Sequence, residues 1–313
     1  KFLPLNLILF WFVIIKNFRK EKVFHCNDLY ALPPAYIIKK FFNKGVKVVY
    51  DCHEHETEGG IYVGKPILKY IAKLFEKKMI GGAEKVITVS NSIAKEYVEM
   101  YGIDKPKLVL NSPQYWEDKK YDLFRKRFNI PKDKTIFLYQ GQYMKRRGVE
   151  ELIEIFRELE NKNKNLVLVF LLYGKGLDDL KERARDCQNI YFHKKVSVLE
   201  YMKYVSSADW GIFLLQNTCK SYDYSLANKI FDYVIGGLPI IVSDLKEMRN
   251  FVQKNRVGYI IDSNCKEGVI ELLNSIDKNK KEDFIQDIKK VAKKYCWEEQ
   301  EKVLINVYNS LEE

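Results

Sequence analysis

Residues 221–244, SYDYSLANKIFDYVIGGLPIIVSD, place three polar side chains at the start of a short helical stretch that leads into an apolar strand. Asn228 and Lys229 lie four and three residues before Asp232, spacings that put all three on one helical face. The Gly-Gly pair supplies a left-handed stop, and PIIV is typical of a strand buried on both sides of a parallel sheet. The stretch therefore predicts a polar triplet at a helix N-terminus, where backbone N–H groups and the helix dipole favour an anion.

The composition is that of a globular protein of two ordinary domains, with 313 residues, 47% of them hydrophobic. Six scattered cysteines without a CxxC pair argue against a metal cluster or a disulfide scaffold and fit a reducing cytosol. The formal charge of +11 comes mostly from lysine. It indicates either solvated faces or an anionic partner, a membrane surface or a phosphorylated substrate. No nucleic-acid-binding motif is present, so nucleic acid is not expected as a partner.

The chain opens with an apolar run, FLPLNLILFWFVII, at residues 2–15. Fourteen residues are few for a membrane span, so we expect a buried helix here. The run lacks a starting Met and a small-residue cleavage site, which argues against a signal peptide. A recognisable strand follows directly, and we expect the chain to begin partway through its first domain.

Strand-like and helical runs alternate almost throughout, which predicts an α/β protein with parallel sheets wrapped by helices. A polar, irregular stretch at 114–134 interrupts the alternation and is interpreted as the bridge between two domains. We predict a first domain at 1–112, a second at 113–295, and a final amphipathic helix within 296–313 that crosses back to the first. Two doubly wound halves predict a ligand in the cleft between them, at the C-terminal ends of the strands.

A second cationic helix start occurs in YQGQYMKRRGVEELI, residues 139–153. A strand ends near Gly141, and the basic run 145–147 precedes Gly148 and a helix. Arg147 at this helix start is suited to holding a diphosphate, although a solvated basic turn is an equal alternative. Together with Lys229 it would neutralise a diphosphate in one cleft. Asp232 would accept hydrogen bonds from ribose hydroxyls, or else pair with Lys229.

These segments, followed by the YGKG turn at 173–176 and N-K-x-F-D-Y at 228–233, resemble the donor half of the family 4 retaining glycosyltransferases. In the first half, HCNDLY, YDCHEHETE and EKVITVSNSIAKEY are similar to that family's acceptor domain, and YCWEEQEKVLINVY is similar to its crossing helix. The resemblance implies the GT-B fold, two Rossmann-like domains facing across a cleft, with the first domain truncated at its N-terminus.

The resemblance implies an enzyme of the hexosyltransferase type (EC 2.4). It would move a sugar, with retention, from a nucleoside-diphosphate sugar to a glycan or lipid-linked acceptor, in cell-surface polysaccharide synthesis. It implies no metal and no cofactor, and a cytoplasmic protein that associates peripherally with the inner face of the plasma membrane. A sugar-nucleotide epimerase and a non-catalytic nucleotide-sugar-binding or partner-binding protein remain alternatives. The second gains weight because Tyr224 stands where the family has the first acid of its E-x7-E motif.

Carried over position by position, the resemblance assigns the diphosphate to Arg147 and Lys229 and the ribose to Asp232. Gln142 stands where many members have arginine, and Asp223, beside Tyr224, is a candidate replacement for the missing acid. The remaining expected donor contacts are Gly141, Gly174, Val196 beside the base, and the backbone of Leu226, Ala227 and Asn228.

His53 matches a histidine that lines the sugar pocket in this family, and it is the expected catalytic residue of the first domain. An ordinary polar loop residue is an equal alternative. The His53–x–His55 pair suggests zinc, but no third ligand at usable spacing is evident, and no metal is expected.

The helical run KPILKYIAKLFEKKM, residues 65–79, carries apolar and lysine faces. We expect Ile67, Ile71, Leu74 and Phe75 to pack into the core, with a solvated face of Lys69, Lys73 and Lys77. The alternative is that this lysine stripe rests on anionic lipid headgroups, with a lipid-linked acceptor.

Overall fold

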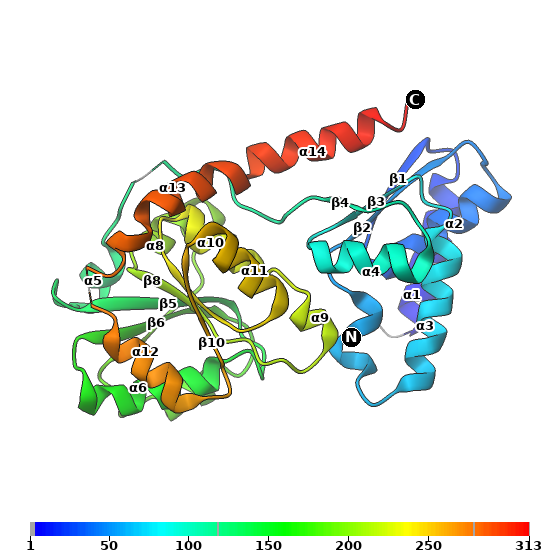
Figure 1. Cartoon of the computed structure of the whole chain (residues 1–313). Coiled ribbons are helices and arrows are strands. Elements are labelled where there is room, and N and C mark those ends of the chain that lie inside the picture. The colour runs from blue at the N-terminus through cyan, green and yellow to red at the C-terminus, as the bar shows by residue number, and fades with distance from the viewer. Residues whose placement is uncertain (1–3, 118, 278, 313) are drawn as a thin grey trace. The chain divides into compact units, whose positions relative to one another are not determined.

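The computed structural model describes residues 4–117, 119–277 and 279–312, which form two compact units, each with its own sheet (Figure 1). Unit 1 comprises Lys1–Leu110, Thr218–Ser225 and Gln300–Glu313. Unit 2 comprises Asn111–Asn217 and Leu226–Glu299. The predicted α/β alternation is confirmed, because both sheets are built of parallel strands joined through helices.

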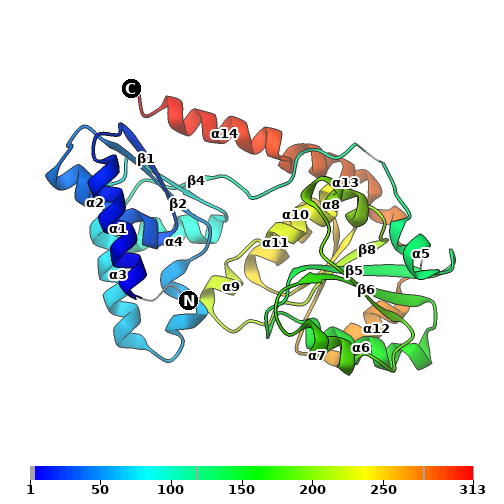
Figure 2. The ribbon, with the colours of Figure 1, turned by 180° about the vertical axis from the view of Figure 1, so that it is seen from behind.

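Unit 1 holds a four-stranded sheet in the order β1-β2-β3-β4, all neighbours parallel. Helices α1, α2 and α3 pack in sequence, α1 on α2 and α2 on α3, and form a layer beside this sheet in both views (Figures 1 and 2). Its elements are α1 (Pro4–Phe18), β1 (Val23–Asn27), η1 (Leu29–Ala31), α2 (Leu32–Phe41), β2 (Lys47–Cys52), η2 (Glu56–Glu58), η3 (Gly60–Tyr62), α3 (Pro66–Ile80), β3 (Lys85–Thr88), α4 (Asn91–Tyr101), β4 (Lys107–Leu108), α9 (Lys220–Asp223) and most of α14 (Trp297–Asn309).

Unit 2 holds a six-stranded sheet in the order β10-β9-β8-β5-β6-β7. The chain winds outward from β5 to β7, then returns to β8 and winds the other way, so the strand order reverses between β5 and β8. Helices α6 and α12 pack together on one face, and α10 packs with α8 and α13 on the other (Figure 1). Its elements are α5 (Leu123–Phe128), β5 (Thr135–Gln142), α6 (Val149–Lys162), β6 (Leu166–Tyr173), α7 (Leu177–Arg183), β7 (Ile190–His193), α8 (Val198–Val205), β8 (Trp210–Phe213), α10 (Asn228–Ile235), β9 (Ile240–Ser243), α11 (Lys246–Asn255), β10 (Gly258–Ile261), α12 (Lys266–Ser275) and α13 (Glu282–Tyr295).

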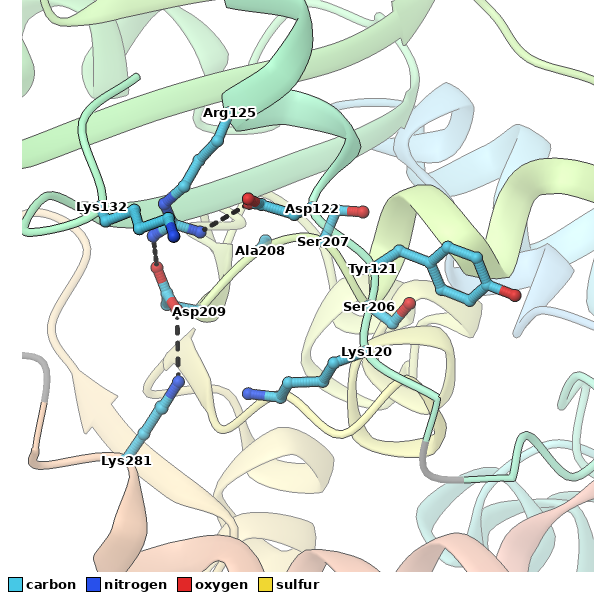
Figure 3. Close-up of a pocket in the computed structure, with 10 residues that line it drawn as sticks. All are labelled: Lys120, Tyr121, Asp122, Arg125, Lys132, Ser206, Ser207, Ala208, Asp209 and Lys281. Atoms are coloured by element: carbon cyan, nitrogen blue, oxygen red, sulfur yellow. Dashed lines mark hydrogen bonds and ion pairs between the residues drawn. The ribbon is translucent and has the colours of Figure 1, made fainter. Parts of the chain in front are cut away.

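A buried carboxylate, Asp209, fixes the N-terminal edge of the unit 2 sheet. Figure 3 shows it between Arg125 and Lys281, at 2.7 and 3.3 Å. It also accepts the backbone N–H of Ile136, the second residue of β5. Burial alone would raise the pKa of Asp209, but these cations and the backbone hydrogen bond lower it. Lys120 lines the same pocket, and burial together with the nearby Lys281 lowers its pKa to about 8.

The expectation of a buried helix at the start of the chain is wrong. Helix α1 exposes Leu5, Ile8 and Phe12 by 65%, 57% and 61%. It packs against α2, and only one side of it, including Ile14 and Ile15, reaches the core of unit 1. Residues 2 and 3 of the predicted run lie outside the described residues. No helix in the described part of the chain is long and apolar enough to cross a membrane.

The expectation for residues 65–79 is wrong about which face of the helix points inward. Helix α3 exposes Ile67, Ile71, Leu74 and Phe75, the residues expected in the core. Lys69 and Lys73, expected in solvent or on lipid, instead pair with the buried carboxylate of Glu58. The physical reason is a buried polar network beneath α3, centred on Glu76.

Candidate functional site

The quoted helix is α10, and it begins at Asn228 as predicted and ends ahead of the Gly-Gly pair. Its N-terminus has no side-chain cap, so the first N–H groups of the helix keep their capacity to bind an anion. The following strand, β9, is buried at every position. Because β5 and β8 flank the reversal of strand order, their C-terminal ends mark the switch point where open α/β sheets bind ligands.

Lys229 reaches this switch point from α10. Its Nζ lies 4.2 Å from the ring centre of Tyr139 on β5 and 4.1 Å from that of Phe213 on β8. A Cβ added to Gly141 would lie 3.7 Å from the same Nζ, so the amine lies directly beside this glycine. Two aromatic faces thus hold the amine beside Gly141, near the end of β5.

The environment lowers the pKa of Lys229 to about 7, first through burial and then through the positive charge of Arg147, with Asp232 opposing. The positive charge of Arg147 acts on the Lys229 amine, so the two predicted cations would act together on an anion of more than one charge.

The turn that carries Arg147 is fixed by its backbone. Tyr139 donates its hydroxyl hydrogen to the Arg147 carbonyl oxygen at 2.8 Å. Gly148 follows with φ of 83°, and a Cβ on it would lie 2.0 Å from the Leu214 carbonyl oxygen. Glycine is therefore required at this position, where it starts α6 directly after the basic run.

Asp232 faces two donors that the sequence did not reveal. Its Oδ2 accepts hydrogen bonds from the Tyr201 hydroxyl at 2.8 Å and from Gln140 Nε2 at 3.0 Å. Burial raises the pKa of Asp232 to about 6, although Tyr201 and Lys229 act in the opposite sense. Asp232 and Lys229 each favour the charged form of the other, but among the described residues the two side chains form no direct ion pair, so the salt bridge considered from the sequence is only a longer-range attraction. Tyr201 lies on α8, and only a known three-dimensional arrangement could have pointed to it.

The other predicted donor contacts lie in unit 2 as well. Gln142 is exposed at the end of β5, and Gly174 lies beside the Tyr143 carbonyl, 3.5 Å from a Cβ added there. Val196 follows β7 and is partly buried. Leu226 is buried, and Ala227 is the residue before the first turn of α10.

His53 belongs to unit 1. Its backbone N–H is donated to Asp28 Oδ1 at 3.1 Å, and its Nε2 lies 3.4 Å from Asn27 Oδ1 and 3.7 Å from Asp51 Oδ2. These contacts hold His53 at the C-terminal ends of β1 and β2. Within the described residues, no group of three or more His, Cys, Asp or Glu side chains is arranged to hold a metal ion.

Tyr224, which stands in place of the family's first acid, and Asp223 belong to the segment Thr218–Ser225 of unit 1. The Tyr224 ring lies 6.5 Å from that of His55, which is fully buried. Glu96 Oε1 contacts His55 Nε2 at 3.4 Å and Lys220 Nζ at 2.7 Å. Burial would raise the pKa of Glu96, but the hydrogen bond from Lys220 and the nearby His55 lower it to about 2. The ion pair between Glu96 and Lys220 anchors the segment Thr218–Ser225 within unit 1.

The family model described as "Glycosyl transferases group 1" matches residues 120–295, and "Glycosyltransferase Family 4" matches residues 2–111. No curated protein matches the chain. Both matches agree with the family resemblance found in the motifs.

Several solved structures share the fold. A TarM variant from S. aureus, crystallised with UDP, is 15% identical, with a TM-score of 0.70. The match covers 97% of this chain and 59% of that one. Sucrose-phosphate synthase from Thermosynechococcus elongatus is 15% identical, with a TM-score of 0.74, over 98% of this chain and 78% of that one. An α,α-trehalose-phosphate synthase (UDP-forming) from Burkholderia vietnamiensis is 9% identical, with a TM-score of 0.73, over 99% and 81%. The chain thus spans less than two thirds of the TarM structure.

Proposed function

We propose that this chain, which belongs to the group 1 glycosyltransferases, transfers a sugar from a nucleoside diphosphate to an acceptor. The model of that family matches residues 120–295. The chain's α/β fold is the GT-B fold expected from the motifs. The donor site is assigned to unit 2, at the switch point between β5 and β8.

The observation that carries this proposal is the position of Lys229 against Gly141, with Arg147 near enough to lower the amine's pKa. The two cations come from two helix starts, α10 and α6. A diphosphate would receive hydrogen bonds from both side chains and from the uncapped N–H groups of α10. It would also offset the repulsion that Lys229 experiences without it.

The proposed mechanism is transfer with retention at the anomeric carbon. The bond from the anomeric carbon to the diphosphate oxygen breaks as the acceptor hydroxyl attacks from the same face, and the hydroxyl proton passes to the departing phosphate oxygen. Arg147, Lys229 and the helix N-terminus stabilise the negative charge that grows on the leaving diphosphate. Asp232 binds the ribose through the oxygen that Tyr201 and Gln140 leave open, and His53 is proposed to line the sugar pocket. The proposal requires neither metal nor cofactor.

The acceptor is proposed to be a glycan or a lipid-linked sugar used in cell-surface polysaccharide synthesis, on the cytoplasmic side of the membrane. A non-catalytic nucleotide-sugar-binding protein is the second candidate. It is favoured by one observation, that the position of the family's first acid carries Tyr224 and lies in unit 1 beside His55.

The test has a binding arm and a chemical arm. Arg147→Ala and Lys229→Ala should each weaken nucleoside-diphosphate binding by about 1.5–3 kcal/mol, the range for hydrogen bonds to charged groups. Lys254→Ala, on the exposed surface of α11 in the same unit, is the matched control and should bind as wild type does. Unchanged calorimetric affinity in both site variants would remove the diphosphate from this site.

Mass spectrometry of a panel of nucleotide sugars, each incubated with candidate acceptors, then separates the two candidate functions. Transfer or slow donor hydrolysis supports an enzyme. Tight donor binding with no product from any donor supports the non-catalytic candidate.

A further inference from the structure

Helix α3 carries a continuous apolar face that points to solvent. Six apolar side chains of the helix form this face, and each is between 43% and 76% exposed. Two more exposed apolar residues, Ile61 at 67% and Val63 at 58%, precede the helix. We call the helical residues the α3 apolar face; they are Ile67, Leu68, Tyr70, Ile71, Leu74 and Phe75.

The orientation of α3 is imposed by its other side. Glu76 is fully buried and accepts hydrogen bonds from the hydroxyls of Tyr50 at 2.8 Å, Tyr97 at 2.8 Å and Tyr101 at 2.5 Å, with Thr57 at 3.3 Å. Turning α3 to bury its apolar face would take this carboxylate away from all its donors. Leaving buried polar groups without partners is costly, so the apolar face stays outside.

A second pairing supports the same orientation. Glu58 is 6% exposed and is held by two lysines of α3, Lys69 and Lys73, the latter at 2.6 Å. These hydrogen bonds outweigh the burial of Glu58, so the pKa of this carboxyl is lowered. The side of α3 that carries Glu76, Lys69 and Lys73 therefore faces the protein, with Met79 and Ile80 buried at the end of the helix, and the α3 apolar face points away from it.

The exposed charges that α3 and the residue before it place around the α3 apolar face have one sign. Lys65 precedes the helix, and Lys77 and Lys78 follow the face at its end; all three are exposed. Lys78 continues the row of Ile67, Ile71 and Leu74 at spacings of four, three and four residues. The single acidic residue of α3 is the buried Glu76. No carboxylate of the helix is thus available to repel an anionic surface.

We propose that the α3 apolar face docks on an anionic lipid bilayer, with Lys65, Lys77 and Lys78 at the level of the headgroups. Apolar and aromatic side chains bordered by lysines, on a helix lying in the plane of the interface, are the chemistry that such a surface binds. A protein partner would need to match both the apolar face and its basic border, whereas an anionic bilayer offers both at once. This inference deepens the proposed function, since a lipid-linked acceptor would lie in the same bilayer, but its test requires no transfer activity.

The test is co-sedimentation of the whole chain with vesicles of phosphatidylcholine alone or mixed with phosphatidylglycerol. Ile67→Ser/Ile71→Ser/Leu74→Ser should lose binding to the mixed vesicles by tenfold or more. Val198→Ser/Leu199→Ser is the matched control, because these residues are 88% and 90% exposed at the start of α8 in unit 2. It should sediment as wild type does.

A charge variant tests whether the lysines at the border of the face contribute to binding. Lys65→Gln/Lys77→Gln/Lys78→Gln should weaken binding to the mixed vesicles by about fivefold for each charge removed, and added salt should reduce the wild-type binding. Nucleoside-diphosphate binding, measured in each variant, shows that unit 2 is intact and reports separately on the proposed function.

Three results would overturn the proposal. They are equal sedimentation of the apolar variant and wild type, binding that does not depend on phosphatidylglycerol, and the absence of wild-type binding to either vesicle. A different result is a wild type that binds no vesicle and forms a dimer in light scattering. If the apolar variant is then monomeric, the face is an interface between copies of the chain.

Discussion

Lys229 should make diphosphate binding depend on pH. An amine with a pKa of about 7 is charged below that pH and largely neutral above it. A diphosphate favours the charged form, so binding above pH 7 must take up a proton. The second phosphate ionisation and the carboxyl of Asp232, both with a pKa of about 6, are largely deprotonated above pH 7, which leaves the lysine as the main group at the site that titrates between pH 7 and pH 9.

The magnitude follows from the fraction of protein in the binding-competent, charged form. The apparent dissociation constant rises as that fraction falls. With a pKa of about 7, the affinity should fall about fivefold from pH 7 to pH 8 and about fiftyfold from pH 7 to pH 9. The same lowered pKa acts on stability. The unfolded state binds more protons than the folded state between about pH 7 and 10.5, so this lysine makes the free energy of unfolding rise with pH across that window.

The assay is calorimetric titration with a nucleoside diphosphate from pH 7 to pH 9, in pairs of buffers that differ in ionisation enthalpy. The buffer dependence counts the protons taken up, and we expect close to one at pH 8. Lys229→Arg is the matched variant, because an arginine stays charged throughout this range. Its affinity should be nearly independent of pH.

Two outcomes would refute the reasoning. An affinity of the wild type that stays flat over this range would mean that Lys229 is charged throughout or does not meet the diphosphate. A pH dependence of Lys229→Arg as steep as that of wild type would assign the proton to another group.

Three further substitutions test the site and its support. Asp232→Asn should weaken a ribonucleoside diphosphate and spare inorganic diphosphate, as competition titrations would measure; equal shifts for both would remove Asp232 from the ribose site. Asp209→Asn should cost about 3–5 kcal/mol in urea unfolding at neutral pH, because it leaves buried cations without their partner. Since the folded pKa of Asp209 is lowered, its contribution is present above the unfolded pKa and lost as the pH falls through the folded value, so wild type and variant should converge in acid. Gly148→Ala should lower thermal stability by at least about 1–3 kcal/mol and impair donor binding, because φ of 83° and the Leu214 carbonyl leave no room for a Cβ; an unchanged melting temperature would contradict this.

The sequence was sufficient where the signals were local. The spacing of Asn228, Lys229 and Asp232, with the glycines after them, predicted α10 and β9 at the right positions. Helix caps, turn glycines and apolar runs act over a few residues, so a single sequence carries them.

The orientation of α3 shows where the sequence fell short. An amphipathic pattern says that a helix has two different faces, but not which one turns inward. That choice was made by Tyr50, Tyr97 and Tyr101, which come from β2 and α4 and meet Glu76 only in the folded chain. The hydrogen bond from Tyr201 to Asp232 is a similar case, because the two residues lie 31 positions apart in the sequence.

The chain passes between its units four times, after residues 110, 217, 225 and 299, because both the segment Thr218–Ser225 and the C-terminal stretch return to unit 1. Recombination between related genes at a single point after residue 110 would therefore not exchange one complete unit for another. It would set a foreign 218–225 segment opposite Glu96, whose partner Lys220 would then have to be supplied by the incoming gene. A functional chimaera needs crossovers at all four passages, or a partner gene that keeps a cation at position 220. Productive recombination within this family should thus leave residues 218–225 and 300–313 inherited together with the first half of the chain.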